Sequence, residues 1–263
     1  MNRWLLINSG AGGAAFNMAL DEALFEAMPR IGKPVLRFYG WTEPAASFGY
    51  FQKFEDVERA MLLRPLVRRP TGGGIVPHDA DWTYSLVFPT SHDWYSLTAI
   101  ESYRRVHEWI QAAFAKLNTE TQLAPSCKKS VPSSRGAGEA HSEKSGIGNR
   151  KFETSQSLLT PAPAAVLPGQ CFAGYEKFDV LWHGKKIAGA AQRRNKPGLL
   201  IQGSVQPPPI SPDRAGWEKA MGDVGRVEFG AEWSDLEPDT TLRERAEFLA
   251  KQKYSQPAHN RKR

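Results

Sequence analysis

The sequence predicts a protein that combines helices with antiparallel strands, and three observations support this prediction. Short strands at 178–182, 185–194 and 199–205 are separated by tight turns, which is the pattern of an antiparallel meander. Residues 82–88 alternate between apolar and polar side chains, which predicts a half-buried strand. Residues 96–117 keep apolar side chains at the helical period, which predicts a long amphipathic helix.

The first predicted helix covers residues 13–28, where apolar side chains recur every four positions. Asn17 and Asp21 form a separate polar stripe one turn apart. We interpret this stripe as a capped or solvated face of the helix. Two short strands are expected to follow, at 35–39 and 47–51.

The next helix is predicted at 54–63, and its acidic first turn suits the helix dipole. The long helix 96–117 carries a capping box formed by Thr98 and Glu101. Residues 124–168 are rich in Ser, Gly, Pro, Ala, Lys and Glu and show no period, so we expect a disordered insertion there.

Beyond the meander, a proline-rich stretch precedes two predicted helices, at 213–221 and 240–253. The basic residues 260–263 close the chain, and we expect this tail to be frayed.

The composition of the 263 residues, 41% apolar and 24% charged, is that of a soluble globular protein. No run approaches the ~18 apolar residues of a membrane span, and the N-terminal apolar core is too short for a signal peptide. Two cysteines suit a reducing compartment, so a cytoplasmic protein is expected. The net charge of +6 favours an acidic partner, but basic and aromatic residues are not interleaved as in nucleic-acid binders.

Residues 68–79 combine two arginines, the glycines Gly72 to Gly74 and a His-Asp pair. Glycines permit a positive φ and close approach of a ligand, and adjacent N–H groups can bind an anion or a polarised carbonyl. A glycine-rich hairpin with solvated arginines is the alternative. The loop lacks the later glycine and the Lys-Ser/Thr pair of a phosphate-binding loop, and no metal-site spacing occurs among the histidines.

Two further residues are candidates for chemistry. Cys171 lies where the irregular insertion ends, and a nearby cation would lower the pKa of its thiol; a small core side chain is the alternative. Lys185 and Lys186 begin a strand and face opposite ways, so one of them points inward. The alternative for Lys186 is an edge-strand lysine that blocks aggregation.

These segments together resemble the lipoate–protein ligase and octanoyltransferase family. Residues 68–79 are similar to its Arg-Arg-x-Ser/Thr-Gly-Gly-Gly-x-Val-x-His-Asp motif, and residues 184–193 to its Gly-Lys-Lys-x-x-Gly-Ser-Ala-Gln-Arg segment. The flanking segments 17–24, 36–41 and 47–52 agree as well. The order and spacing of these motifs carry the resemblance.

The resemblance covers about residues 3–123 and 169–206. It implies an α+β fold related to biotin–protein ligase, with a mixed, mostly antiparallel sheet flanked by helices. It also implies a catalytic domain over 1–206 that contains the insertion 124–168, followed by a short helical C-terminal extension over 207–263.

In such proteins the acyl chain lies in a tunnel across the sheet, and the resemblance implies that Lys186 approaches the acyl carbonyl. The residues implied to bind the substrate are Arg69, Thr71, Gly72, Gly73, Gly74, His78, Gly189, Ala191, Gln192, Gly203 and Ser204. The chain departs from the pattern at Ala190, which replaces the usual serine, and at Gln202, where many relatives carry a histidine before Gly-Ser.

The family has a transferase branch, which needs no cofactor, and a ligase branch, which uses ATP and magnesium. Gln170-Cys171-Phe172 resembles the nucleophile segment of the cysteine-dependent octanoyltransferases, and the 58 residues beyond Val205 leave little room for an accessory domain. The resemblance therefore implies transfer by Cys171 and Lys186 from acyl carrier protein to a lipoyl domain or glycine-cleavage H protein. An ATP-dependent ligase and a non-catalytic acyl or carrier-protein binding module remain alternatives.

Overall fold

The computed structural model describes residues 2–127, 172, 174–209 and 213–262. The elements follow one another as β1 (Arg3–Gly12), α1 (Ala14–Ile31), β2 (Val35–Trp41), β3 (Ala45–Phe48), α2 (Phe54–Ala60), β4 (Leu66–Arg68), β5 (Val76–His78), β6 (Trp82–Pro89), α3 (Asp93–Ser96), α4 (Ala99–Lys116), β7 (Gln122–Leu123), β8 (Val180–Trp182), β9 (Lys185–Asn195), β10 (Gly198–Val205), α5 (Arg214–Phe229), β11 (Glu232–Asp235), α6 (Thr240–Leu249), η1 (Ala250–Tyr254) and α7 (Pro257–Asn260).

Two sheets are formed by these strands. The larger has the order β11-β1-β2-β6-β10-β9-β8-β7, and the smaller has the order β4-β3-β5. In the larger sheet β1 pairs in parallel with β2 and with β11, and the other neighbours are antiparallel. The predicted α+β fold with a mixed, mostly antiparallel sheet is confirmed, and so is the meander, which is formed by β8, β9 and β10.

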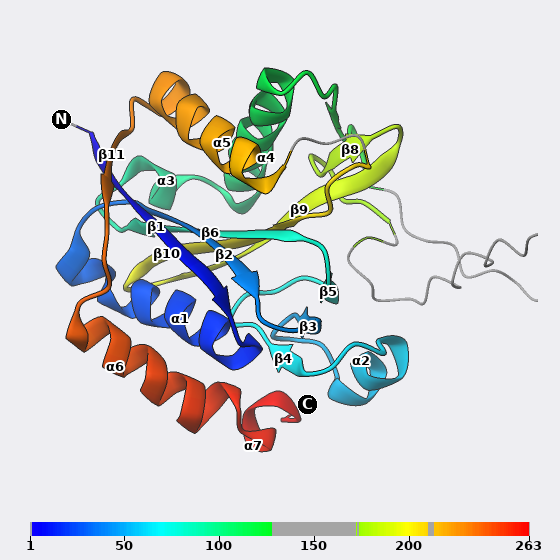
Figure 1. Ribbon diagram of the computed structural model, residues 1–263, viewed down its shortest axis with the longest axis vertical. Helices are drawn as coiled ribbons and strands as arrows, with labels where there is room; N and C mark the ends of the chain where they lie inside the picture. Colours follow the sequence, from blue (N-terminus) through cyan, green and yellow to red (C-terminus); the bar gives the residue numbers. More distant parts are fainter. Residues whose placement is uncertain (1, 128–171, 173, 210–212, 263) are drawn as a thin grey trace, which may run out of the picture.

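Helices cover both faces of the large sheet (Figure 1). The helices α4 and α5 pack on one face through an aromatic core, while α1 packs on the other and is itself covered by α6. All eight residues of β6 are buried, because this strand lies in the middle of the sheet between the two layers. The predicted strand at 82–88 is therefore confirmed, but the prediction that it is only half-buried was wrong.

The packing of α1 on the large sheet also corrects the interpretation of its polar stripe. Asn17 and Asp21 are 1% and 0% exposed, so this face is not solvated. Asn17 donates from Nδ2 to the carbonyl oxygens of Gly12 (3.0 Å) and Gly40 (2.8 Å), and thereby connects the helix start to β1 and β2.

Several boundaries differ from the predicted ones, and the strands β1, β4, β5, β7 and β11 were missed. The N-terminal residues form β1, and Glu232–Asp235 in the segment 207–263 forms β11 at the edge of the large sheet. The helix predicted at 213–221 continues to Phe229. The capping box was predicted correctly, since Thr98 and Glu101 exchange both hydrogen bonds at the start of α4.

The predicted insertion 124–168 lies largely outside the described residues. Its first residues are described, and there Cys127 is exposed and its Sγ lies 2.8 Å from Oε2 of Glu176. Within the described ranges no helix combines the length and apolar character that crossing a membrane requires.

The buried His107 of α4 makes stability depend on pH. Burial, together with the nearby Lys186 ammonium, lowers the pKa of His107 to about 3. The unfolded chain, with a pKa of about 6.5, binds a proton in the interval between these values that the folded chain does not, so stability falls as the pH falls through it. We expect His107→Leu to remove up to about 1.4 kcal/mol of this loss per pH unit.

Urea unfolding at pH 7.5, 6.5, 5.5 and 4.5 checks this expectation. The free energy of unfolding is plotted against pH for wild type and for His107→Leu. The other histidines contribute equally to both plots, so the difference between them reports the titration of His107. Parallel curves for wild type and His107→Leu would show that the residue does not titrate in this way.

Candidate functional site

A small cavity lies between the large sheet and the β4-β3-β5 sheet, where segments far apart in the chain meet. Its volume is about 40 Å³. The cavity is lined by Met18, Tyr39, Ser47, Arg69, Gly73, Val76, His78, Thr83, Gly189, Ala190, Ala191, Gln202, Gly203 and Ser204. Both segments that carry the family resemblance, the glycine loop and β9, therefore border the same space.

The glycine loop is shaped around the Arg69 guanidinium. Arg69 Nη2 donates to the carbonyl oxygens of Gly72 and Gly74, both at 2.9 Å, and Arg69 is only 5% exposed. Gly73 adopts a φ of 88°, which glycine takes without strain, and this residue lines the cavity opposite Ala191. The interpretation of solvated arginines was wrong, because Arg69 supports the loop from inside.

The preceding arginine, Arg68, is anchored from outside by the C-terminal segment. Its guanidinium donates to the backbone oxygens of Tyr50 (2.8 Å), Gln52 (2.7 Å) and Asn260 (2.9 Å), and its backbone N–H donates to Oδ1 of Asn260 (2.9 Å). Arg68 is 0% exposed. The expectation of a frayed tail was therefore wrong for Asn260, whose contacts satisfy a buried cation.

Of the two lysines that begin β9, Lys185 is exposed and Lys186 points inward. The Lys186 ammonium lies 2.7 Å from Oδ2 of Asp179, and both side chains are about 5% exposed. Burial raises the pKa of Asp179, while Lys186 acts in the opposite direction. A Cβ on Gly189 would lie 2.7 Å from Nζ of Lys186, so glycine at this position lets the ammonium reach the edge of the cavity.

A hydrogen-bonded relay borders the cavity at its other side. Nε2 of His78 lies 2.7 Å from Oγ of Ser47, and Nδ1 lies 2.9 Å from Oδ2 of Asp81. Burial lowers the pKa of His78 although Asp81 opposes this shift, so the ring is neutral near pH 7. Trp41 stacks on the imidazole with ring centroids 3.8 Å apart and donates from Nε1 to Thr83.

Beneath the cavity lies the fully buried carboxylate of Asp21. Its oxygens accept hydrogen bonds from Arg37 (2.7 Å), Ser85 (2.7 Å), Tyr39 (3.0 Å) and Gln202 (2.7 Å). Gln202 in turn accepts from Thr71 Oγ1 at 2.7 Å. One buried network therefore connects α1, β2, β6 and β10 to the glycine loop.

The structure brings many of the predicted site residues together. Arg69, Gly73, His78, Gly189, Ala191, Gly203 and Ser204 line the cavity. Thr71 adjoins the cavity through its hydrogen bond to Gln202, and Lys186 adjoins it through its contact with Gly189. Gly72, Gly74 and Gln192 do not line the cavity. Cys171 lies outside the described residues.

Sequence reasoning missed several residues around the cavity, including Ser47, Thr83, Asp81 and Asp179. Nothing in the local sequence marks Ser47 or Thr83, since each is a small polar residue in a strand. Asp179 directly precedes β8, and only the pairing of β8 with β9 places it beside Lys186. In the described part of the chain no three His, Cys, Asp or Glu side chains form a cluster that could hold a metal ion.

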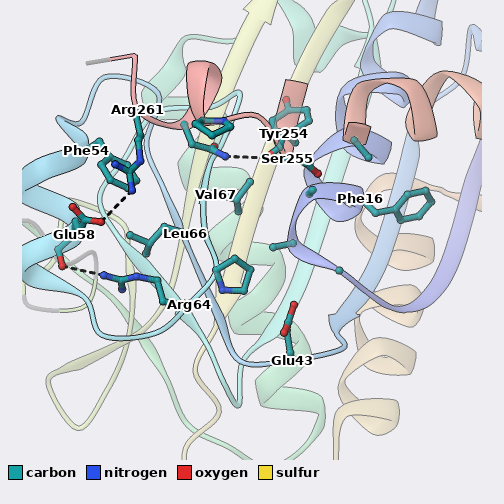
Figure 2. A pocket seen from close by; sticks show the side chains of 17 residues that line it. Phe16, Glu43, Phe54, Glu58, Arg64, Leu66, Val67, Tyr254, Ser255 and Arg261 are labelled. Carbon is teal, nitrogen blue, oxygen red and sulfur yellow. Dashed lines mark hydrogen bonds and ion pairs between the residues drawn. The ribbon is translucent and has the colours of Figure 1, made fainter. Parts of the chain in front are cut away.

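A larger groove, of about 700 Å³, lies between the start of α1, α2, β4 and the C-terminal segment (Figure 2). Phe54, Leu66 and Val67 supply its apolar lining, and Arg261 reaches across toward Glu58 at 3.5 Å. None of the residues predicted to bind substrate lines this groove, so the smaller cavity is the candidate site.

Comparison with known proteins gives a family match and several relatives. Residues 13–206 match the lipoyl protein ligase A/B catalytic domain. The chain is 36% identical over 211 residues to octanoyltransferase LipM of Kyrpidia tusciae and 34% identical over 210 residues to octanoyltransferase LipM of Bacillus subtilis. These alignments cover 78% and 77% of this chain but 66% and 64% of the relatives, so the chain spans slightly less than two thirds of their length.

Two solved structures titled as lipoate protein ligases share the fold of this chain. Protein Ta0514 of T. acidophilum with bound lipoic acid has a TM-score of 0.67 and 19% identity, with 99% of each chain covered. Lipoate-protein ligase A bound with ATP has a TM-score of 0.66 and 19% identity, covering 99% of this chain and 98% of its own. At 19% sequence identity, this similarity shows a shared fold and nothing further about function.

Proposed function

Because the chain belongs to the lipoyl protein ligase A/B catalytic domain family, we propose that it transfers an octanoyl or lipoyl group between proteins. The donor is acyl carrier protein, and the acceptor is a lysine of a lipoyl domain or of glycine-cleavage H protein. The observation that carries this proposal is the buried Lys186, whose ammonium lies against Gly189 at the edge of the cavity. The octanoyltransferase names of the relatives support the choice of acyl group.

The first half-reaction forms a thioester on Cys171. The Cys171 thiol loses its proton to solvent, its thiolate attacks the carbonyl of the carrier-bound acyl group, and the bond to the carrier sulfur breaks. The carrier leaves as a thiolate, which takes up a proton from solvent. A lysine ammonium nearby favours the thiolate and stabilises the oxyanion, by about 3 kcal/mol for one well-placed donor. The position of Phe172 supports the assignment of Lys186 as this ammonium. Phe172 directly follows Cys171 in the chain, and its ring centroid lies 5.3 Å from Nζ of Lys186.

The second half-reaction transfers the acyl group to the acceptor. The acceptor lysine loses its proton, attacks the thioester carbonyl as a neutral amine and forms an amide, and the Cys171 thiol is released. Neither step consumes a nucleotide, so the proposed reaction needs no ATP and no magnesium.

Intact-mass spectrometry after incubation with octanoyl carrier protein tests the first half-reaction. We expect an increase of about 126 Da, the mass that thioester formation with an octanoyl group adds. The increase should disappear in Cys171→Ala and persist in Cys127→Ala, which removes the other cysteine and serves as the matched control.

Transfer to a lipoyl domain with and without ATP tests the same proposal against a ligase. Equal octanoylation under both conditions agrees with a transferase. No adduct on the wild type, combined with ATP-dependent lipoylation that Cys171→Ala retains, would contradict the proposal and favour a lipoate–protein ligase. Acyl binding without any turnover would instead favour a non-catalytic binding module.

A further inference from the structure

The strand that leads into the glycine loop is covered at its edge by residues 254–260, which we call the C-terminal clamp. In the order β4-β3-β5, β4 is an edge strand, and such a strand presents backbone groups that no neighbouring strand pairs. Oδ1 of Asn260 accepts the backbone N–H of Arg68 at 2.9 Å, and Nε2 of His259 lies 3.3 Å from the carbonyl oxygen of Arg68. Side chains of the clamp therefore take the place of a further strand beside β4 (Figure 1).

The clamp also supplies acceptors to the buried Arg68 guanidinium. Nε donates to the carbonyl oxygen of His259 (3.2 Å) and Nη2 to that of Asn260 (2.9 Å). Nη1 donates to the carbonyl oxygens of Tyr50 (2.8 Å) and Gln52 (2.7 Å), so one cation connects the clamp with the turn at 49–52. Arg68 is 0% exposed, and a buried charged donor that loses its acceptor is costly, so the position of Arg68 depends on the clamp.

The turn at 49–52 lies directly against the glycine loop. The backbone N–H of Tyr50 donates to the carbonyl oxygen of Thr71 at 2.9 Å. A Cβ on Gly49 would overlap the carbonyl oxygen of Gly73, so the absence of a side chain permits this approach. Gly73 lines the cavity. A displacement of Arg68 would therefore reach the cavity wall through this turn as well as along the chain.

The clamp is held on β4 by hydrogen bonds and not by apolar packing. No residue of α7 is buried, and the groove of about 700 Å³ separates the clamp from the start of α1 (Figure 2). Nδ2 of Asn260 donates to the carbonyl oxygen of Tyr254 at 2.8 Å. The Asn260 amide thus uses its oxygen to hold Arg68 and its nitrogen to hold the clamp together.

The other end of the clamp is anchored independently of β4. Tyr254 is 1% exposed, and its hydroxyl donates to Oε2 of Glu22 on α1 at 2.8 Å. Arg193 of β9 donates to the other oxygen of this carboxylate at 2.9 Å. Loss of the Asn260 contacts would therefore free the part of the clamp that touches β4 and leave its start in place.

We propose that the C-terminal clamp holds the glycine loop in the position that binds the acyl substrate, with Asn260 as the positioning residue. This inference rests on the proposed function, which makes the glycine loop a wall of the substrate site. Coupling between two sites is reciprocal, so a ligand that favours the binding position of the loop also favours the docked clamp.

Kinetics of octanoyl transfer from the N-acetylcysteamine thioester to a lipoyl domain test the role of Asn260. In Asn260→Ala we expect KM for the thioester to rise about tenfold with kcat little changed, because the loop loses its binding position while the reacting groups keep theirs. Asn260→Asp keeps the acceptor for the Arg68 N–H and should restore the KM of the wild type. Arg261→Ala is the matched control, because this adjacent residue contacts Glu58 of α2 instead of β4, and its KM should not change.

Hydrogen exchange measured by mass spectrometry tests the clamp without turnover. In ligand-free Asn260→Ala, peptides that cover residues 47–52 and 66–76 should exchange about tenfold faster than in the wild type, because local opening of the loop becomes easier. Peptides from β8 and β9 should not change. In the wild type, octanoate should slow exchange in residues 254–260 as well as in the glycine loop.

Each outcome decides between the clamp and a merely structural segment. Unchanged KM and unchanged exchange in Asn260→Ala overturn the inference, even where urea unfolding shows a loss of stability. An equal rise in KM in Arg261→Ala also overturns it, because the effect then does not depend on the contact with Arg68. The protection by octanoate needs no variant, so its absence in a wild type that transfers octanoyl groups contradicts the coupling. A wild type that transfers none contradicts the proposed function, and exchange in the ligand-free proteins then decides the clamp alone.

Discussion

Lys186→Met is expected to lower kcat/KM for octanoyl transfer about 100- to 1,000-fold, the effect of removing one preorganised oxyanion donor. The same change takes away the cation that favours the Cys171 thiolate. The rate of alkylation of Cys171 by iodoacetamide, followed as a function of pH, should then shift to higher pH. A residue with only a structural role would not move this profile.

The single substitution also has a structural cost that needs a control. Lys186→Met removes the ammonium that pairs with the buried Asp179 carboxylate, which then keeps only its hydrogen bond from the backbone amide of Glu176 at 2.7 Å. Breaking a buried ion pair in this way costs about 3–5 kcal/mol. The double variant Lys186→Met/Asp179→Asn removes both charges and should recover most of the stability, measured by urea unfolding. Its transfer rate should stay low; a double variant as active as the wild type would contradict the role of Lys186.

Features that depend on neighbouring residues could be predicted from the sequence. The capping box at Thr98 and Glu101 needs only a spacing of three residues, and the meander of β8, β9 and β10 needs only short turns between apolar strands. The inward orientation of one lysine at the start of β9 follows from the alternation of a strand.

Features that depend on distant segments could not be predicted in this way. The polar stripe of α1 is buried because β2, β6 and β10 contact it from sequence positions up to about 180 residues away. The strand β11 is short and polar, and it pairs with β1 across more than 200 residues of sequence, as in the register Arg3 with Glu232. A periodic pattern identifies a helix face, but it does not show whether another segment covers that face.

Gln202 illustrates the same limit at the candidate site. By sequence it is a departure from the motif that the family resemblance implies. In the structure its amide accepts from Thr71 and donates to Asp21, so it connects the glycine loop to the buried core. Gln202 therefore supplies a polar contact between β10 and the loop.

Asp21→Ala is expected to destabilise the protein by about 3–5 kcal/mol, because it leaves the Arg37 guanidinium buried without its carboxylate partner. Arg37 is held in place by the sheet and cannot reach water, since its side chain is 1% exposed. The substitution also removes the acceptor of Ser85, Tyr39 and Gln202, so three further donors lose a partner. The shift of the urea midpoint measures the loss.

Glu22→Ala provides a matched control, because Glu22 is the neighbouring buried carboxylate on the same helix. Its cationic partners Arg193 and Lys253 are about one third exposed, so water can solvate them once the carboxylate is gone, and among the buried donors of the described residues only the Tyr254 hydroxyl loses its acceptor. The expected loss is therefore smaller, about 1–2 kcal/mol. Equal losses in the two variants would mean that burial of the partner cation does not set the cost. A larger loss for Asp21→Ala, together with weaker binding of octanoate, would indicate that the network beneath the cavity holds the glycine loop in its binding position through Gln202 and Thr71.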